Sequence, residues 1–407
     1  MIGLMNKKKL SNPEASKKSR GITSFMAMDV AEHAKELQRA GRSIIRFELG
    51  EPDFDTPKVV GDAGIRAIRE GKTKYTPSLG TMELREEVCR FFKREYGVKV
   101  ETERVVIANG SSAALFLTFA ALLNKGDEVI MGDPHYACYP NYVSFLDGTP
   151  VFVPLFENEG FKLTAAKIKN ALTKKTKAVL INSPGNPTGV VLPPEELRRI
   201  GGLGVTIVSD EVYHGLSYVG RDRSILEFTD NAFVIGGFSK RFAMTGWRIG
   251  YVIAPREYIR AIQKVQQNFQ ISPGAISQEA GLAALRHGLK DAEKMRKEYA
   301  KRRTVMVEGL RRIGFPVKAG PQGAFYVLTS CAFLDGDSKR LAFRILNEAG
   351  VAVTPGADFG RLGEGHLRFS YATGVKDIRE GLLRLEAFIK KQNVPVKGVL
   401  ALSRRKG

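Results

Sequence analysis

The chain of 407 residues has little cysteine and little histidine. Cys89, Cys138 and Cys331 lie far apart and form no CxxC pair. This spacing excludes a disulfide scaffold and a cysteine-rich zinc module, and it is typical of a reducing compartment. The five histidines include no HxxxH pair, so we predict no metal site.

Long hydrophobic runs are also missing. The longest nearly apolar run, Ala113–Leu123, has 11 residues, about half of what a membrane-spanning helix needs. The first residues, MIGLMNKKKL, have no apolar core and no small-residue cleavage site of a secretory signal. We therefore expect a soluble, cytoplasmic protein without a membrane partner.

Acidic residues are too few to balance the basic ones. The chain has 63 Lys and Arg against 43 Asp and Glu, a net charge of +20, which can indicate a nucleic-acid partner. However, residues 1–20 carry +5 and residues 390–407 carry +6, more than half of the total. We therefore predict disordered basic tails at 1–20 and 392–407, a solvated basic helix face at Lys294–Arg312, and no specific nucleic-acid partner.

The apolar residues are arranged in short runs that alternate with helical patterns. Runs that are apolar at every position predict strands buried on both faces, and hence a mostly parallel sheet between helices. Helices are predicted at Met26–Ala40, Thr81–Tyr96 and Ala113–Leu123, and over much of 254–312. The predicted strands are Ile44–Leu49, Arg104–Ala108, Glu128–Met131, Ala178–Asn182, Val205–Ser209 and Phe233–Gly237.

After Gly314 the pattern changes to that of a smaller α+β domain. Its predicted strands are Phe325–Leu328, Val351–Thr354 and Leu367–Ser370, and its predicted helices are Lys339–Ala349 and Lys376–Lys391. The fold class predicted from these patterns is α/β, with a larger and a smaller domain.

Four short motifs follow predicted strands or lie in one. They are residues 183–189 (SPGNPTG), 209–213 (SDEVY), 239–250 (SKRFAMTGWRIG) and 367–370 (LRFS). Each alone is ordinary: a loop, a helix N-cap, a surface lysine or a surface ion pair. Their joint order and spacing, with Asp210 following Asn186 by 24 residues and preceding Lys240 by 30, is not ordinary.

Together the motifs resemble the class I and II aminotransferases of fold type I, which depend on pyridoxal 5′-phosphate (PLP), and within them the aspartate and broad-specificity subgroup. The resemblance runs from about Ile22 to Lys391 and includes residues 48–53 (ELGEPD) and 74–77 (KYTP). It implies an enzyme that moves the α-amino group between an L-amino acid and a 2-oxo acid in a ping-pong cycle. It also implies an N-terminal segment (21–50) that packs with the small domain, a large PLP-binding domain (51–290) and a small C-terminal domain (291–391).

The resemblance assigns a role at the cofactor ring to five residues. Lys240 would bond covalently to the PLP aldehyde and move the proton, and Asp210 would hold the proton of the pyridine nitrogen. Tyr213 and Asn186 would bind the phenolate oxygen, and Tyr136 would stack on the ring. These residue types suit the chemistry, because PLP acts as an electron sink and the lysine must be neutral part of the time.

The resemblance also implies a phosphate site and a second subunit. Amides at a helix N-terminus bind anions, and a guanidinium adds charge-assisted hydrogen bonds. Tyr75 matches a tyrosine that reaches the phosphate of the neighbouring subunit, so a homodimer with shared active sites is expected. The predicted phosphate residues are Gly110, Ser111, Ser112, Ser239 and Arg248.

For the substrate, the resemblance assigns the α-carboxylate to Arg368, with Gly50 and Asn186 beside it. A planar guanidinium can bind a carboxylate through two parallel hydrogen bonds, which lysine cannot. Apolar residues at Ile22, Phe25 and Met26 are predicted to line the side-chain pocket, which suits alanine, branched or aromatic amino acids.

The chain departs from the family's dicarboxylate pattern at two places. Ser111 stands where one aspartate-preferring subgroup has a lysine for the distal carboxylate. The segment Val265–Gln278, where another subgroup has an arginine from the neighbouring chain, contains no Lys or Arg. The sequence therefore does not support a preference for aspartate.

Two alternatives share the resemblance. A carbon–sulfur lyase or another eliminating enzyme of this fold would use the same Lys240 and Asp210. A transcription regulator with an aminotransferase-like domain would carry a winged helix ahead of it, and only about 21 residues precede the match. A P-loop is absent, and residues 201–204 (GGLG) precede a predicted strand where a dinucleotide fingerprint would follow one.

Overall fold

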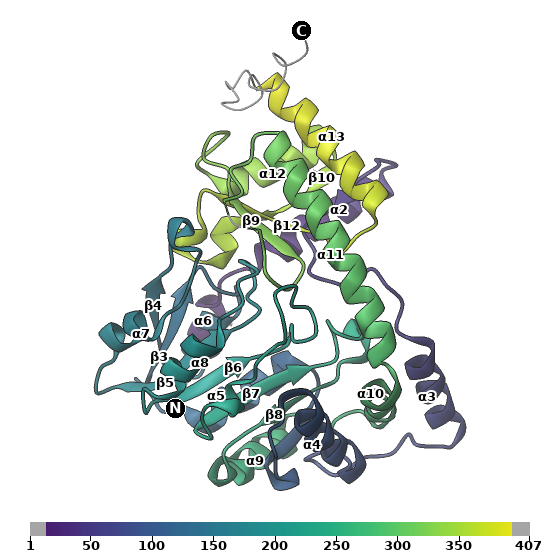
Figure 1. Cartoon of the computed structure of the whole chain (residues 1–407), viewed down its shortest axis with the longest axis vertical. Coiled ribbons are helices and arrows are strands. Elements are labelled where there is room, and N and C mark those ends of the chain that lie inside the picture. Colours follow the sequence, from purple (N-terminus) through teal and green to yellow (C-terminus); the bar gives the residue numbers. More distant parts are fainter. Residues whose placement is uncertain (1–13, 319, 393–407) are drawn as a thin grey trace, which may run out of the picture.

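The structure, a computed structural model, describes residues 14–318 and 320–392. Its larger part is built on a seven-stranded sheet with the order β2-β8-β7-β6-β5-β3-β4 (Figure 1). Strand β8 is antiparallel to both of its neighbours, and the remaining pairs are parallel. The strands are β2 Val105–Ala108, β3 Glu128–Asp133, β4 Thr149–Pro154, β5 Thr176–Asn182, β6 Thr206–Asp210, β7 Ala232–Gly237 and β8 Gly250–Ile253.

Alternate residues of these strands enter two separate hydrophobic cores. In β6, for example, Ile207 packs into one core and its neighbour Val208 into the other, and neither is exposed. A sheet buried on both faces needs helices on both, which explains why residues 178–181 (AVLI) of β5 and 232–235 (AFVI) of β7 are apolar at successive positions. The predicted mostly parallel sheet between two helical layers is confirmed.

The helices of the larger part lie on either side of the sheet. Helix α5 packs on β2, β7 and β8 and against α9, whereas α4 packs on β2 and against α10, which in turn packs on α3. The sequence did not predict β4, β8 or α3. These helices are α3 Lys58–Arg69, α4 Met82–Tyr96, α5 Ser111–Leu122, α6 Tyr139–Phe145, α7 Ala165–Ala171, α8 Pro194–Gly201, α9 Ile259–Phe269 and α10 Ala275–His287.

The smaller part is built around a three-stranded antiparallel sheet, β11-β12-β9, and the long helix α11 runs from α10 to α13 beside it (Figure 1). N-terminal residues join it, because β1 pairs with β10 and α2 packs on α12. The elements are α2 Met26–Arg39, β1 Ile45–Arg46, α11 Leu289–Arg312, β9 Tyr326–Ser330, α12 Ser338–Ala349, β10 Val351–Ala352, β11 Thr354–Pro355, β12 His366–Ser370 and α13 Val375–Lys391.

Strand β1 is shorter than the predicted Ile44–Leu49. The Phe47 amide still donates to the Ala352 carbonyl of β10, and beyond it the backbone has other partners. The Phe47 carbonyl accepts from the Ser370 amide, and the Glu48 carbonyl accepts from the side chains of Arg368 and Thr354. The chain therefore passes from strand pairing into the wall of the site described below.

Part of the predicted N-terminal tail is ordered. Residues Lys17–Arg20 form a single helical turn, α1, and Lys18 lies 2.8 Å from the Asp147 carboxylate. The predicted disorder therefore does not extend over this turn, because an ion pair and a helix cap hold it. Residues 1–13 and 393–407 lie outside the described residues.

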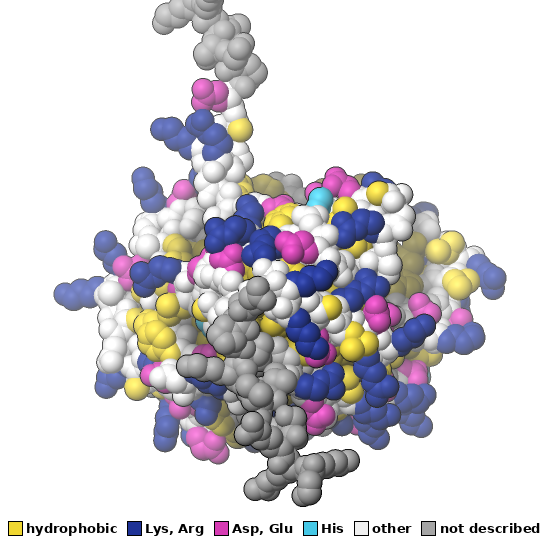
Figure 2. All heavy atoms as spheres, turned by 90° about the horizontal axis from the view of Figure 1, so that it is seen from above, with side chains coloured by type: hydrophobic (Ala, Val, Ile, Leu, Met, Phe, Trp, Pro, Cys, Tyr) yellow, Lys and Arg dark blue, Asp and Glu magenta, His cyan; other side chains and the backbone are white. Residues whose placement is uncertain are grey.

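Basic side chains are spread over the surface. In Figure 2, Lys and Arg alternate with acidic and hydrophobic side chains across the visible face. The predicted solvated face of α11 has an exception in Arg302, which is buried and lies 2.6 Å from Asp53. Among the described residues, no helix is long and apolar enough to cross a membrane.

Candidate active site

A cavity of about 280 Å³ lies where the carboxyl ends of β5, β6 and β7 meet residues of the smaller part. Ligands collect at this edge of α/β sheets because successive strands deliver their following loops there. Most of the predicted site residues line this cavity: Gly50, Ser111, Ser112, Tyr136, Asn186, Asp210, Tyr213, Ser239, Lys240, Arg248 and Arg368. Gly110 and Tyr75 do not.

Lys240 follows β7, and its Nζ donates a hydrogen bond of 2.6 Å to the Gly50 carbonyl. Burial lowers the pKa of Lys240 to about 8, with the guanidinium groups of Arg368 and Arg248 acting in the same direction and the carboxylate of Glu51 opposing them. A substantial fraction of the amine is therefore neutral near this pH and can act as a nucleophile or base.

Asp210 is the last residue of β6 and is 4% exposed. Its Oδ1 accepts from the Val212 amide (3.1 Å) and its Oδ2 from the Tyr139 hydroxyl (2.7 Å). Burial raises the pKa of this carboxyl group, and the bond from Tyr139 opposes the shift. Sequence reasoning missed Tyr139, which begins α6 and whose ring packs edge-on against that of Tyr136, with the centroids 5.2 Å apart.

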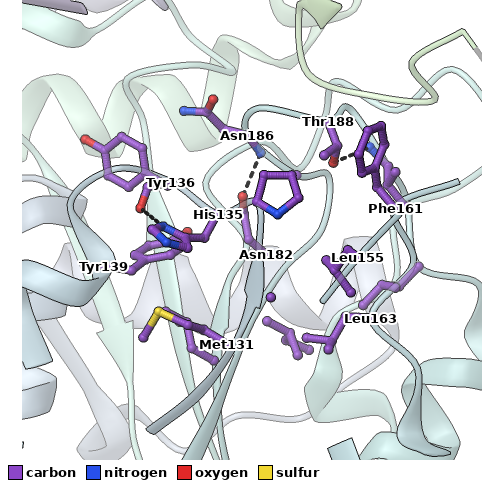
Figure 3. Close-up of a pocket in the computed structure, with 17 residues that line it drawn as sticks. Met131, His135, Tyr136, Tyr139, Leu155, Phe161, Leu163, Asn182, Asn186 and Thr188 are labelled. Carbon is purple, nitrogen blue, oxygen red and sulfur yellow. Dashed lines mark hydrogen bonds between the residues drawn. The ribbon is translucent and has the colours of Figure 1, made fainter. Parts of the chain in front are cut away.

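Asn182, the last residue of β5, connects two predicted site residues. Its Oδ1 accepts from the Asn186 amide (2.8 Å), and its Nδ2 donates to the Asp210 carbonyl (2.9 Å). Figure 3 shows Asn182 beside a second cavity of about 60 Å³. That cavity shares Tyr136 and Asn186 with the larger one and has apolar side chains, including Leu155 and Leu163, on its far side (Figure 3).

Tyr213 lies against Tyr326, a residue that the sequence did not indicate. Their hydroxyl oxygens are 2.8 Å apart, and burial raises the pKa of Tyr213 well above its ordinary value. Gly50 also lies against the Tyr326 hydroxyl group, and a Cβ at position 50 would overlap it. Only glycine therefore allows the backbone at position 50 to reach the cavity.

Arg368 is 2% exposed and is held by neutral partners. Nη1 donates to the Asn186 side chain (2.9 Å), and Nη2 donates to the Glu48 carbonyl (2.6 Å). The guanidinium carbon lies 4.3 Å from the Tyr326 ring centroid. Nε has no partner, and no described carboxylate lies within ion-pair distance of the group. A buried cation without a counter-ion is suited to an anionic ligand.

The start of α5 faces Arg248. Gly110 is its N-cap residue, with φ at +90°, and no side chain of the described residues caps the helix. A Cβ on Gly110 would lie 2.6 Å from Nη2 of Arg248, so the glycine shapes the cradle although it does not line the cavity. Uncapped amides, hydroxyl groups at Ser111 and Ser239, and a guanidinium form a donor set that fits a phosphate group.

The side-chain wall of the cavity differs from the predicted one. Phe25 lines it, together with Ala27 and Met28, whereas Ile22 is 46% exposed and Met26 lies outside the lining. The difference arises because α2 begins at Met26, so that its helical spacing turns residue 28 to the cavity and residue 26 aside. The Phe25 ring meets the Tyr136 ring edge-on at 6.0 Å.

These features define a fold type I enzyme with a lysine, a buried carboxylate and an anion cradle suited to PLP. The family model of class I and II aminotransferases matches residues 42–385. The chain therefore belongs to this family, is an aminotransferase and uses PLP as its cofactor.

Several relatives carry aminotransferase names. The aspartate/prephenate aminotransferase of Thermus thermophilus is 42% identical over 87% of this chain and 94% of its own. The (5-formylfuran-3-yl)methyl phosphate transaminase of Methanocaldococcus jannaschii is 40% identical over 92% and 100%. The solved aspartate aminotransferase of T. thermophilus with maleate has a TM-score of 0.88 at 39% identity, over 92% of this chain and 100% of its own. These relatives do not favour the lyase alternative.

Proposed function

We propose that this aminotransferase acts on L-amino acids with uncharged, apolar side chains, and that the residues of the larger cavity act in the roles implied by the family resemblance. PLP, when bound, supplies the electron sink that makes the substrate Cα–H acidic. The protein supplies the groups that bind the cofactor, orient the substrate and move the proton.

The positions of the side chains support these roles. The Lys240 amine holds the cofactor and moves the proton at the substrate Cα, for which its lowered pKa suits it. Asp210 is fixed by two hydrogen bonds and would hold the proton of the ring nitrogen as a buried anion. Tyr213 and Asn186 would bind the phenolate oxygen of the cofactor, and Tyr136 would pack on its ring.

The two remaining cationic side chains of the cavity are proposed to bind the cofactor phosphate and the substrate α-carboxylate. The start of α5, with Ser239 and Arg248, binds the phosphate, and Arg368 binds the α-carboxylate of the substrate. The observation that carries the proposed substrate class is that the described residues lining the cavity include Lys240, Arg248 and Arg368 as their only Lys or Arg side chains. Each already has a role, so this chain offers no cation for a second carboxylate, and Phe25 and Met28 offer an apolar wall.

Because several relatives are named for aspartate, a comparison of aspartate with apolar amino acids tests the proposed substrate class directly. Transamination rates for phenylalanine, leucine, alanine and aspartate would be measured with one common 2-oxo acid. We expect kcat/KM for phenylalanine or leucine to exceed that for aspartate by at least about tenfold, the range that one unfavourable side-chain contact produces. A preference for aspartate would overturn the proposed substrate class and leave the aminotransferase assignment intact.

We also propose that the enzyme is a cytoplasmic homodimer with shared active sites. Tyr75 is 85% exposed and far from any role in its own cavity. Thr76 donates to the Pro273 carbonyl, so the loop of Tyr75 contacts the loop that follows the exposed Phe269 and Ile271. Exposed apolar side chains on two contacting loops support a second copy as the partner. The domain boundaries 21–50, 51–290 and 291–391 remain proposals, supported by the pairing of β1 with β10.

A further inference from the structure

The start of α2 is capped by a residue 332 positions away in the sequence. Phe25, the N-cap residue of this helix, makes no side-chain cap. Instead, Asp358 accepts hydrogen bonds from the Met26 amide (Oδ1, 2.9 Å) and the Ala27 amide (Oδ2, 3.2 Å). Asp358 is 7% exposed. A carboxylate at this position satisfies two helix amides and interacts favourably with the helix dipole.

The capped end of α2 is the part that enters the active site. Phe25, Ala27 and Met28 line the larger cavity, and the Phe25 ring meets the edge of Tyr136. The two amides held by Asp358 lie between Phe25 and Met28 in the sequence. The position of this cap therefore determines where the apolar wall stands relative to the cofactor face.

The turn that carries Asp358 also contacts the carboxylate side of the site. This turn is the 3₁₀ helix η6, Gly356–Phe359. The Phe359 ring centroid lies 4.9 Å from the Arg368 guanidinium carbon, and the Phe359 carbonyl accepts from the His135 amide (2.9 Å), next to Tyr136. The Ala357 amide donates to the Ser338 side chain at the start of α12 (3.0 Å). One short turn thus joins Arg368, Tyr136 and α2.

We propose that Asp358 is a positioning residue for substrate selection: by capping α2 from η6, it holds Phe25 and Met28 at a fixed distance from Arg368 and so sets the side-chain pocket of the substrate. This inference rests on the proposed function of the cavity. Asp358 itself acts through the α2 backbone and does not touch the reacting atoms.

The test compares Asp358→Asn with the wild-type enzyme. Asparagine keeps one acceptor oxygen, but its NH₂ group cannot accept from a backbone amide. Hydrogen–deuterium exchange of residues 22–30, measured without cofactor and with PLP, should become about tenfold faster in the variant, as expected for the loss of a hydrogen bond to a charged group. With PLP bound and the best wild-type amino acid as substrate, KM should rise about tenfold and kcat should change less than about twofold.

Two further variants separate positioning from general stability. Asp377→Asn removes an exposed carboxylate from the first turn of α13 in the same part of the molecule, and it should change neither exchange at 22–30 nor KM. Phe25→Ala removes the wall itself, so KM should rise as in Asp358→Asn while exchange at the Met26 and Ala27 amides stays closer to wild type.

The proposal is overturned if Asp358→Asn leaves exchange unchanged, or if exchange accelerates without a rise in KM. Loss of the visible absorbance of the bound cofactor in this variant would also overturn it, because Asp358 would then act on the cofactor site. The hydrogen-exchange measurement does not depend on turnover, and KM is measured with the amino acid that the wild-type enzyme prefers. If the proposed substrate class is wrong, the comparison of transamination rates among amino acids will show it, and the test of Asp358 will not be affected.

Discussion

Two residues of the cavity wall, Tyr139 and Asn182, hold neighbouring polar groups in place by hydrogen bonds. Tyr139 holds a carboxylate oxygen of Asp210, and Asn182 holds both the Asp210 carbonyl and the Asn186 amide. A buried carboxylate with fixed partners keeps its orientation without reorganising during reaction. We therefore expect these supporting residues to affect catalysis, although motif reasoning did not name them.

Replacing Tyr139 with phenylalanine removes its hydrogen bond to Asp210 and so tests whether that bond matters for catalysis. The Asp210 carboxylate would lose one of two donors and stay buried, so its pKa, already raised by burial, should rise further. Asp210 is needed as an anion, and so the acid limb of the kcat profile should move to higher pH. At neutral pH we expect kcat to fall about tenfold, since a hydrogen bond to a charged group contributes about 1.5–3 kcal/mol.

The pH profile of steady-state turnover provides the measurement for Tyr139→Phe. Tyr258→Phe is a suitable control, because Tyr258 packs on Phe233 and does not line the cavity. An unchanged acid limb in Tyr139→Phe would show that the hydrogen bond to Asp210 has no part in catalysis.

The Lys240 pKa leads to a second residue-scale prediction. Cofactor-free protein should capture PLP at a rate that rises with pH through about 8 and then levels off, because only the neutral amine attacks the aldehyde. The Glu51 carboxylate raises this pKa, so Glu51→Gln should move the midpoint to lower pH.

Stopped-flow absorbance at a series of pH values would follow the capture. Glu70→Gln provides the control, because Glu70 pairs with Lys72 at the surface and should leave the midpoint unchanged. A midpoint near the ordinary lysine value of about 10.4 would mean that Lys240 is not desolvated in the folded protein.

At the scale of helices and strands, the sequence predicted the elements that carry the site better than those around it. Strands β5, β6 and β7 each contain a run of consecutive apolar residues that is followed by a polar motif, so the sequence predicted both the strands and the sheet edge that carries the motifs. Strand β8 was missed because it has only four residues and begins at Gly250, the last residue of the 239–250 motif, so no separate strand pattern stands out. The Asp358 cap on α2 was beyond sequence reasoning, because no local pattern connects residues so far apart.

The proposed phosphate site at the start of α5, directly after β2, can be tested by a substitution at Gly110. Gly110→Ala would place a Cβ 2.6 Å from Nη2 of Arg248 in a backbone region that strongly favours glycine. The Cβ should displace the Arg248 guanidinium from the phosphate cradle, and PLP affinity should fall by at least about tenfold, as expected when a hydrogen bond between charged groups worth about 1.5–3 kcal/mol is lost. Affinity for pyridoxal, which has no phosphate group, should change much less.

Equilibrium titration of the cofactor-free protein with both aldehydes gives the two affinities. Gly97→Ala is a matched control: Gly97 also has positive φ (+75°), at the C-cap of α4, and nothing lies within 4 Å of its Cβ position. It should cost a similar amount of stability and leave both affinities unchanged. If Gly110→Ala weakened the two aldehydes equally, the start of α5 would not be the phosphate site.

At the scale of the whole molecule, large exposed apolar side chains support the proposed homodimer. Soluble proteins seldom expose large apolar side chains close together without a partner. Phe269 is 72% exposed and Ile271 is 51% exposed, and Tyr75 lies in the neighbouring loop. By contrast, Leu383 on α13 is 57% exposed on a helix with a regular amphipathic pattern.

The final prediction concerns assembly. In a homodimer Phe269 becomes a buried anchor, so Phe269→Asp should weaken self-association by at least about thirtyfold, the effect of losing about 2 kcal/mol at an interface hot spot. Because Tyr75 is proposed to complete the site of the neighbouring subunit, PLP affinity and turnover should fall together with dimer content. Sedimentation velocity across a dilution series, paired with activity at each concentration, measures both. Leu383→Asp should remain dimeric and active. A fully active monomer of the 44.8-kDa chain would contradict the shared site, since each cavity would then be complete without a second copy.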